Sequence, residues 1–379
     1  MEDYGLPSCS CCETGGGQGI TDVFWPQIFF SALFPELWCM AGRKRKKIQG
    51  IFPDETSPYR REQAETSGVQ EYNGRYLLRK DSKGTFRTIQ GGVIMGEVLV
   101  IVVTWNAMTW LERCLGSVRG SSVKADIMVV DNCSTDGTQE YVRRAFPDAV
   151  FVQNDSNAGF GAANNIGIKY ALSHGYRYVY LLNQDAWVDK DCIGSMIASL
   201  GDGYGLLSPV QTDSRGNLDR NFERKCGKFL ARHNDSPVVP VPFVMAAHWL
   251  VPTQTFRIVG GFSPVFTQYG EDDNFIDRLH YHGLKCGVVR TATAVHDRLD
   301  RPSSKERRMR LKCVSVVVKL SNPSACFTGQ CLILPFRLLG MSVKNRSLVP
   351  LRFFSELSGM IPVLKKTREE SKTSGAFIF

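Results

Sequence analysis

The chain has 379 residues, which is long enough for one large domain with an appendage or for two domains. Its content of 43% hydrophobic and 22% charged residues is ordinary for a folded globular protein. No run of about 18 uncharged apolar residues occurs, which argues against a membrane-spanning helix.

The net charge of +9 is concentrated near one end of the chain. After Asp300 there are 15 Lys and Arg residues against 4 Glu residues. Such a segment suits nucleic acid, an anionic membrane or a phosphorylated substrate, and its interleaved apolar runs, such as 331–336, favour a membrane surface. We therefore expect residues 301–379 to form a basic, mostly helical extension that contacts a membrane peripherally and binds no nucleic acid. The alternative is a solvated basic face on ordinary helices.

The twelve cysteines are scattered, and only Cys9, Cys11 and Cys12 cluster. No second pair of cysteines completes a zinc site with them. Cysteines such as Cys192 and Cys286 have the surroundings of small core residues. This usage fits a reducing compartment, so we expect a cytoplasmic protein.

Residues 1–95 show no sustained periodicity of a strand or a helix, and residues 54–83 are mostly polar. We expect this part to be a poorly ordered N-terminal extension. Within it, the apolar segment Val23–Met40 is followed by the basic residues 43–47 and is interrupted by prolines. It is a membrane-anchor candidate.

From Glu97 onward, strands alternate with helices. The first strand, Val98–Val103, is an unbroken and mostly β-branched run, as expected for a strand buried on both faces. The alternation occurs four times and predicts an α/β domain with a mainly parallel sheet over residues 96–300. The expected strands are 98–103, 127–130, 150–152 and 178–182, and the expected helices span 108–118, end near 146, end near 173 and begin at 189.

Polar residues follow each of these four strands. Ligands bind at the carboxyl ends of the strands in an open parallel sheet. Turn chemistry explains some of the residues, since Asn, Asp and Ser are common in turns. Their presence at four strand ends nevertheless predicts a ligand site. The residues are Thr104 and Asn106 after the first strand, Asp131 after the second, Asn157 after the third, and Asn183 and Asp185 after the fourth.

A glycine turn, Gly159–Gly161, follows the third strand. A dinucleotide-binding fold would need its glycine motif after the first strand, so the dehydrogenase interpretation is poor. The glycines indicate a close approach of the backbone to a ligand or partner. A helix that begins with a tight turn is the alternative.

Three consecutive carboxylates, Glu271 to Asp273, open a later helix. Acidic residues are common in a first turn because they interact favourably with the helix dipole. Asp272 shares a helix face with Ile276 and Leu279, which predicts that it points inward. A carboxylate placed in this way is a general-base candidate, and a plain N-terminal charge cluster is the alternative.

His296 ends another apolar strand. A lone histidine is more often structural than a ligand. Together with Asp185 it would form a sparse oxygen and nitrogen site for Mg²⁺ or Mn²⁺, completed by diphosphate oxygens.

Residues 97–300 resemble an inverting glycosyltransferase of family 2 with the GT-A fold, in particular its rhamnosyltransferase-like bacterial branch. Each motif alone is weak, but the order of the motifs and their positions at strand ends make the set specific. The matching motifs are VTWN at 103–106, VDNxSxDG at 130–137, NxGFGxxN at 157–164, LNQD at 182–185, GGF at 260–262, GED at 270–272 and HD at 296–297.

The resemblance implies a Rossmann-like, mainly parallel sheet flanked by helices, with a C-terminal helical extension. It also implies that Asp131 binds the base of a nucleotide sugar, with Thr104 and Asn106 nearby. The glycine turn would lie along the nucleotide and the sugar, and its residues are Asn157, Gly159, Phe160, Gly161 and Asn164.

The resemblance further implies that Asp272 is the catalytic base and that Asp185 and His296 hold Mn²⁺ or Mg²⁺. The residues implied at the acceptor are His248, Trp249 and Glu271, with the aromatic ring available for stacking. The family often has a carboxylate where this sequence has Asn183. Rhamnosyltransferase-like members often share this asparagine. An amide in place of the carboxylate removes a negative charge and so weakens binding of the metal ion.

The implied reaction is a single in-line displacement that inverts the anomeric centre. We expect transfer from a nucleotide-diphosphate sugar, with a rhamnose-type donor favoured, to a glycan or lipid-linked glycan in cell-surface polysaccharide synthesis. The enzyme would act at the inner face of the membrane. A nucleotidyltransferase would need a basic, glycine-rich phosphate loop near the first strand, which is absent. A non-catalytic nucleotide- or glycan-binding module is the alternative that Asn183 suggests.

Overall fold

The structure is a computed structural model that describes residues 96–298 and 304–378 together with four short strands before them. The predicted anchor candidate Val23–Met40 and most of the predicted N-terminal extension lie outside the described residues. So does the predicted domain boundary at 300/301. Four short strands of this extension are described, and they pair antiparallel in chain order. These are β1 (Val69–Tyr72), β2 (Tyr76–Lys80), β3 (Phe86–Gln90) and β4 (Val93–Ile94).

The centre of the described fold is a nine-stranded mixed sheet. Strands β7, β6, β5 and β8 lie side by side and are parallel, as predicted. Strand β12 then runs antiparallel between β8 and β10, while β10 and β13 are parallel. The strands are β5 (Val98–Thr104), β6 (Ala125–Asp131), β7 (Val150–Gln153), β8 (Tyr178–Asn183), β9 (Ala186–Val188), β10 (Tyr204–Thr212), β11 (Val238–Val241), β12 (His248–Pro252) and β13 (Lys285–His296).

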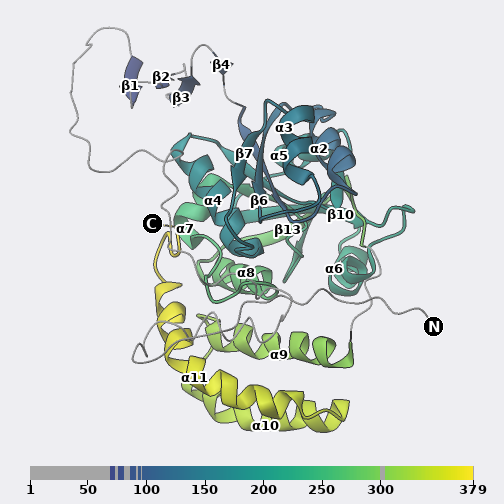
Figure 1. Cartoon of the computed structure of the whole chain (residues 1–379), viewed down its shortest axis with the longest axis vertical. Helices are drawn as coiled ribbons and strands as arrows, with labels where there is room; N and C mark the ends of the chain where they lie inside the picture. Colours follow the sequence, from purple (N-terminus) through teal and green to yellow (C-terminus); the bar gives the residue numbers. More distant parts are fainter. Residues whose placement is uncertain are drawn as a thin grey trace, which may run out of the picture. The chain divides into compact units, whose positions relative to one another are not determined.

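Helices cover both faces of this sheet (Figure 1). Alternate residues of β5 enter different cores, with Leu99 and Ile101 on one face and Val100 and Val102 on the other. Because both faces of this strand are packed, its residues form an apolar run without polar gaps. The helices are α2 (Leu111–Arg119), α3 (Thr138–Ala145), α4 (Phe160–Ser173), α5 (Cys192–Ala198), α6 (Arg220–Arg232), α7 (Thr253–Val259) and α8 (Glu271–Tyr281).

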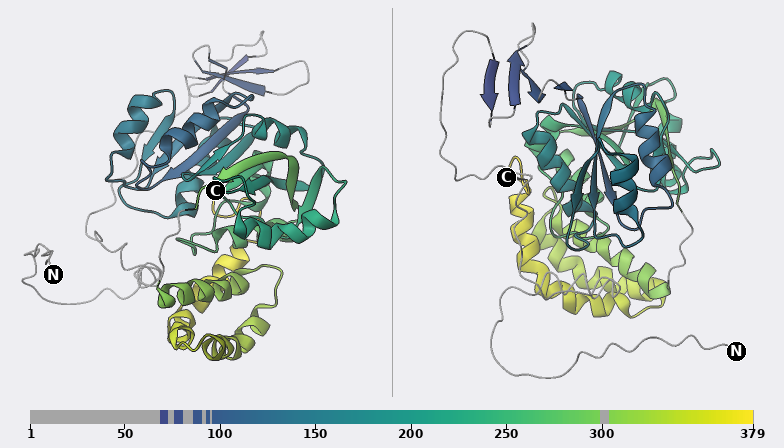
Figure 2. Two further views of the ribbon diagram at one scale, coloured as in Figure 1. Left: turned by 90° about the vertical axis from the view of Figure 1, so that its right-hand side faces the viewer. Right: turned by 45° about the horizontal axis from the view of Figure 1, so that its top comes forward.

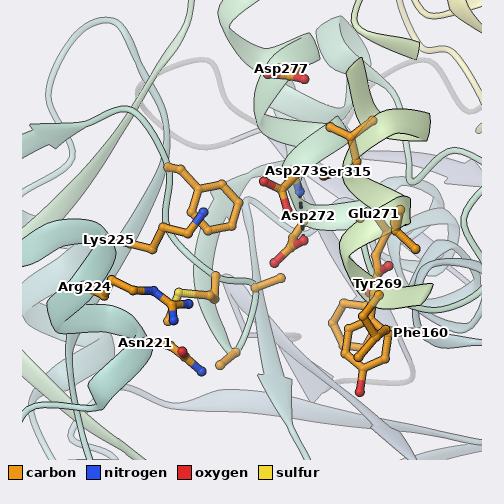
Figure 3. Close-up of a pocket in the computed structure, with 18 of the residues that line it drawn as sticks. Phe160, Asn221, Arg224, Lys225, Tyr269, Glu271, Asp272, Asp273, Asp277 and Ser315 are labelled. Carbon is orange, nitrogen blue, oxygen red and sulfur yellow. Dashed lines mark hydrogen bonds between the residues drawn. The ribbon is translucent and has the colours of Figure 1, made fainter. Parts of the chain in front are cut away.

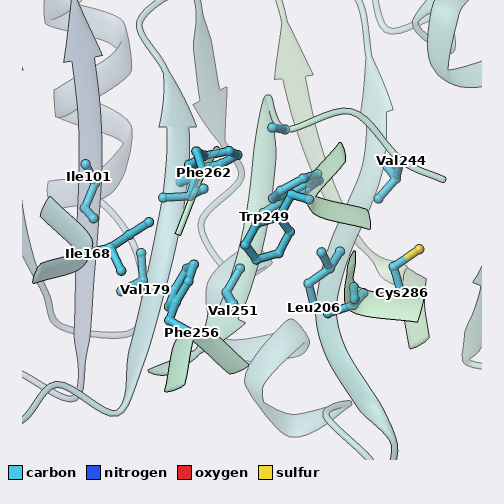
Figure 4. Packing of buried hydrophobic residues seen from close by; sticks show 14 of the residues in the cluster. Ile101, Ile168, Val179, Leu206, Val244, Trp249, Val251, Phe256, Phe262 and Cys286 are labelled. Carbon is cyan, nitrogen blue, oxygen red and sulfur yellow. The ribbon is translucent and has the colours of Figure 1, made fainter. Parts of the chain in front are cut away.

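The larger core contains a cluster of aromatic rings (Figure 4). Trp249 of β12 packs on Phe262 and Phe275, with ring centroids 6.2 and 5.4 Å apart. Phe256 of α7 lies 5.9 Å from Phe275 by the same measure. These contacts fix α7 and α8 against the sheet and so determine where α8 begins.

Three helices form the C-terminal extension: α9 (Lys305–Ser321), α10 (Phe327–Asn345) and α11 (Val349–Glu370). Helix α9 contacts α8 on one side and α10 and α11 on the other (Figures 1 and 2). The prediction of a helical extension is confirmed for residues 304–370.

The chain then returns to the sheet domain. The amide of Gly261 donates to the carbonyl of Ala376 at 2.8 Å, and Ile378 is buried in the larger core. Nearby, the fully buried Arg278 donates to the carbonyls of Val259 and Gly261. These hydrogen bonds give the buried guanidinium polar partners, and they fix the segment between α7 and α8.

Candidate functional site

A pocket of about 680 Å³ opens where α6, α8 and α9 meet the ends of β8 and β13 (Figure 3). Three of its walls come from segments far apart in the sequence. Helix α8 contributes Glu271, Asp272 and Asp273, while Asn183 and His296 mark the strand ends. The pocket lies at the ends of β8 and β13, whereas the predicted residues Thr104, Asn106 and Asp131 at the ends of β5 and β6 do not line it.

Asp272 is half-buried in this pocket and lies at the second position of α8. Helix α8 begins after Gly270, which has φ of 89°, a conformation that suits glycine. The amide of Asp273 donates to Oδ1 of Asp272 at 2.8 Å. Burial and the neighbouring negative charge of Asp273 raise the pKa of Asp272 to about 7. A carboxylate with such a pKa exchanges a proton readily near neutral pH.

Glu271 is more deeply buried than Asp272, and its Oε2 has no partner in the described structure. Burial and the charge of Asp272 raise the pKa of Glu271 to about 8. The raised pKa favours the neutral acid form of Glu271, which can donate a hydrogen bond into the pocket. The sequence placed it at the acceptor, and the structure places it on the pocket wall.

Asp185 and His296 lie together at the ends of β8 and β13. Strand β9 pairs with β13 so that Ala186 stands opposite His296, which brings the preceding Asp185 to the histidine. Nε2 of His296 is 3.4 Å from Oδ1 of Asp185. Burial raises the pKa of Asp185, but the hydrogen bond and charge of His296 outweigh it, so this pKa lies below its usual value.

The pair offers a partial metal site. His296 lines the pocket and its Nδ1 has no hydrogen-bond partner, and neither does Oδ1 of Asn183. Among the described residues, no group of three or more His, Cys, Asp or Glu side chains gathers as a complete ligand set. Two protein ligands with further oxygens from a bound diphosphate would suit Mg²⁺ or Mn²⁺.

Asp131 lies fully buried at the end of β6 and is the centre of a hydrogen-bond network. Its oxygens accept from the hydroxyls of Thr104 and Ser134 at 2.7 and 2.5 Å. They also accept from the Ser134 amide and from Nε2 of Gln153. A nucleotide base would therefore have to share or replace one of these donors. The network orders the β6 end whether or not a ligand is bound.

The loop after β5 is held by its neighbours. Asn106 adopts φ of 51°, and its amide donates to Oγ of Ser134 at 2.8 Å. Its Oδ1 accepts from the amide of Thr135. Trp105 and Gln184 exchange two hydrogen bonds, which join the ends of β5 and β8. The predicted residues at these strand ends thus form one connected edge.

The glycine turn before α4 is a close contact between two loops. Gly159 has φ of 84°, and a Cβ there would lie 2.0 Å from the carbonyl oxygen of Thr267. A Cβ on Gly161 would lie 2.9 Å from Cβ of Phe262. In this structure the two glycines therefore allow the turn to pack closely against Thr267 and Phe262. Phe160 between them lines the pocket.

Two asparagines complete the turn. Oδ1 of Asn157 accepts from the amide of Gly159, and the buried Asn164 donates to the carbonyl of Phe160. The neighbouring Asn165, which the sequence did not single out, exchanges two bonds with the backbone of Phe262. Asn157 and Asn164 thus shape the turn, while Asn165 fixes the loop that faces it.

The expectation that His248 and Trp249 stack on an acceptor is corrected by the structure. Both are fully buried in β12. His248 lies between the Tyr180 hydroxyl and the carbonyl of Val295, and burial with the nearby charge of His296 lowers its pKa to about 3. Trp249 belongs to the aromatic core. Adjacent residues of a central strand point to opposite packed faces, so neither reaches the pocket.

Sequence reasoning missed the walls that α6 and α9 provide. Asn221, Arg224 and Lys225 come from α6, and Lys319 comes from α9. Asp219 caps α6 by accepting from the amides of Asn221 and Phe222. Which side of α6 and α9 faces the pocket follows from how these helices pack on the rest of the fold, and a single sequence does not show that packing.

A pocket lined with carboxylates at the ends of the strands of a mixed sheet, four of whose neighbouring strands are parallel, is the arrangement of an enzyme that binds its substrate at the open edge of the sheet. Residues 99–252 match the family described as Glycosyl transferase family 2. The chain is a glycosyltransferase, and this part of it is a family 2 domain.

Two curated relatives agree with this assignment. The chain is 26% identical over 235 residues to N-acetylglucosaminyl-diphospho-decaprenol L-rhamnosyltransferase of Mycobacterium tuberculosis, covering 53% of this chain and 76% of the relative. It is 21% identical over 217 residues to the low-salt glycan biosynthesis hexosyltransferase Agl10 of Haloferax volcanii, covering 54% and 68%. The resemblance to the rhamnosyltransferase-like branch is thus confirmed.

Among solved structures, the chain is similar to the mannosyltransferase PcManGT from Pyrobaculum calidifontis in complex with GDP-Man and Mn²⁺. The identity is 18%, the coverage is 74% of this chain and 84% of that chain, and the TM-score is 0.47.

Proposed function

We propose that the protein transfers a sugar, with inversion, from a nucleotide-diphosphate sugar to a glycan or lipid-linked glycan in cell-surface polysaccharide synthesis. The observation that carries the proposal is Asp272, a half-buried carboxylate with a pKa of about 7 that faces the pocket at the start of α8. A rhamnose-type donor is favoured because the chain resembles an L-rhamnosyltransferase.

In this mechanism Asp272 accepts the proton of an acceptor hydroxyl as the oxygen attacks the anomeric carbon. One displacement at that carbon gives inversion. Glu271, whose raised pKa favours the neutral acid, donates a hydrogen bond to an acceptor oxygen and thereby orients it. The glycine turn, with Phe160 in the pocket wall, would lie against the donor sugar.

A divalent cation, Mn²⁺ or Mg²⁺, is part of this proposal. Asp185 and His296 would hold it, with the Asn183 carboxamide nearby. When bound, the ion supplies positive charge that stabilises the departing nucleoside diphosphate. The base of the nucleotide would bind near Asp131, with Thr104 and Asn106 forming the edge beside it.

The proposed cellular position is the cytoplasmic side of a membrane, in peripheral contact with it. Among the described helices, none combines the length and the apolar character that crossing a bilayer requires. Helix α10 instead exposes Leu332, Phe336, Leu339 and Val343, which recur at helical spacing along one face. The helix contains Arg337 and Lys344 but no acidic residue. Such a face suits an anionic lipid surface.

The test of the proposed reaction compares the wild type with Asp272→Asn in the presence of Mn²⁺. Sugar transfer and nucleotide release are measured for a panel of nucleotide sugars. Loss of the base is expected to reduce transfer by about 10²- to 10⁴-fold. Asp202→Asn, which removes an exposed carboxylate elsewhere, serves as the matched control and retains activity.

Full transfer activity in Asp272→Asn would show that another group is the base. A non-catalytic binding module is the second candidate, because Asn183 replaces a carboxylate and no complete ligand set gathers among the described residues. Tight binding of one donor without any turnover in the wild type would favour that candidate.

A further inference from the structure

Four cationic side chains line the pocket that contains Asp272, and Arg298 is one of them. Arg224 and Lys225 come from α6, and Lys319 comes from α9. Figure 3 shows Arg224 and Lys225 reaching into the pocket from one side, with Asp272 and Asp273 on the other. The described structure thus places positive and negative walls opposite each other, with open space between them.

These cations are largely available to a ligand. Within residues 96–298 and 304–378, neither Arg224 nor Lys319 forms an ion pair. Lys225 lies 4.5 Å from the ring centroid of Phe243 and lowers the pKa of Asp273, which burial otherwise raises. A fourth cation of the pocket, Arg298, is engaged differently, because it pairs with Asp219 at 2.8 Å.

The local fold fixes Arg224 and Lys225. The Asp219 cap and the buried Phe222 and Cys226 set the rotation of α6 about its axis. Two consecutive basic residues on the exposed side of that helix then face the pocket. Arg220 and Lys228 belong to the same helix and do not line the pocket.

The position of these cations indicates which substrate they face. A general base must lie against the hydroxyl of the acceptor, so side chains across the same pocket lie against the acceptor too. The residues expected near the nucleotide base, Thr104, Asn106 and Asp131, do not line this pocket, whereas Asn183 and His296 of the proposed metal site do. Because Arg224 and Lys225 lie across the pocket from Asp272, they stand on the acceptor side.

We propose that Arg224 and Lys225 of α6, with Lys319 of α9, bind a phosphate or diphosphate group of the acceptor. The proposal rests on the proposed function only in that Asp272 marks the acceptor side. Arginine and lysine side chains at a pocket wall are the usual partners of phosphate oxygens. An anionic acceptor would also need these cations to approach the carboxylates of α8, since like charges repel.

The probe for this site is inorganic pyrophosphate, titrated into the full chain by calorimetry in EDTA. Removing divalent ions suppresses binding at the metal-dependent donor site, so the acceptor-side cations remain as partners. The wild type is expected to bind the probe, and Arg224→Gln/Lys225→Gln to bind it at least about tenfold more weakly. The matched control Arg220→Gln/Lys228→Gln removes the same charge from the same helix and keeps wild-type affinity. Thermal unfolding of each variant establishes that it is folded.

Two outcomes would overturn the proposal. One is equal loss of affinity in the two double variants, because a general charge effect would then explain binding. The other is binding that requires Mn²⁺, survives Arg224→Gln/Lys225→Gln and is lost in Asp185→Asn, because the phosphate site would then be that of the donor. Since the titration measures no sugar transfer, it can fail while the proposed reaction stands, and succeed while that reaction fails.

Discussion

At the scale of single residues, Asp272 makes the activity sensitive to pH. The base must be deprotonated to accept a proton, and burial raises its pKa to about 7. We therefore predict that kcat/KM rises about tenfold per pH unit below pH 7 and levels off above it. The measurement is a pH profile with a saturating donor.

The cause of that raised pKa supplies a control. The negative charge of Asp273 contributes to it after burial. Asp273→Asn should therefore move the midpoint of the profile to lower pH, because deprotonating Asp272 no longer costs repulsion. A midpoint that stays in place would show that a different group titrates.

Gly159 leads to a second prediction at this scale. Gly159→Ala puts a Cβ 2.0 Å from the Thr267 carbonyl oxygen at a positive φ, so one of the two loops has to move. We expect a loss of at least about 3 kcal/mol in the free energy of unfolding, measured in urea.

Gly137 provides the matched control for that substitution. Its φ is 90°, but a Cβ there meets nothing within 4 Å. Gly137→Ala should therefore cost only the backbone strain, about 1–2 kcal/mol. Equal losses in the two variants would contradict the contact with Thr267.

At the scale of helices and strands, α10 carries the prediction about the membrane. Leu332, Phe336 and Val343 keep 74%, 75% and 71% of their surface exposed, which is unusual for large apolar residues. We predict that Phe336→Ser/Leu339→Ser reduces binding to vesicles of phosphatidylcholine with one-third phosphatidylglycerol, measured by co-sedimentation. The reduction follows from losing apolar area at the lipid interface.

Leu218→Ser/Tyr281→Ser removes two exposed apolar residues outside the C-terminal helices and should bind vesicles normally. Sedimentation velocity tests whether the exposed apolar face of α10 binds a second copy of the chain instead. If the wild type self-associates through α10 and does not bind vesicles, the partner of this apolar face is a second copy of the chain and not a lipid surface.

The sequence predicted this level of structure where the signal is local. Val98–Thr104 had to be a central strand because both of its faces are apolar and packed. The start of the next helix was predicted too early, because Met108 is exposed and only Leu111 begins the buried stripe. The apolar spacing alone did not reveal that difference.

The site was predictable only in part for the same reason. Asp185 and His296 each end a strand, which the sequence showed, and their 3.4 Å contact follows from the pairing of β9 with β13. The burial of Trp249 depends on which strands flank β12, and the role of Lys319 depends on where α9 docks. Such long-range packing leaves no local pattern in one sequence.

At the scale of the whole described molecule, the C-terminal helices contribute one wall of the candidate site. Helix α9 supplies Val314, Val318 and Lys319 to the pocket that contains Asp272. The sheet domain and the extension therefore share one site. The expected division at residue 300 remains a prediction about folding units, whereas the pocket depends on both sides of it.

The extension is also attached to the sheet domain at two separated places, through α9 on α8 and through Ala376 on Gly261. Two separated attachments restrict how far the extension can turn relative to the sheet domain. If α10 rests on a bilayer, the direction in which the pocket opens is then set relative to the lipid plane. An acceptor anchored in that bilayer would meet the pocket by lateral diffusion in two dimensions, with its orientation already constrained.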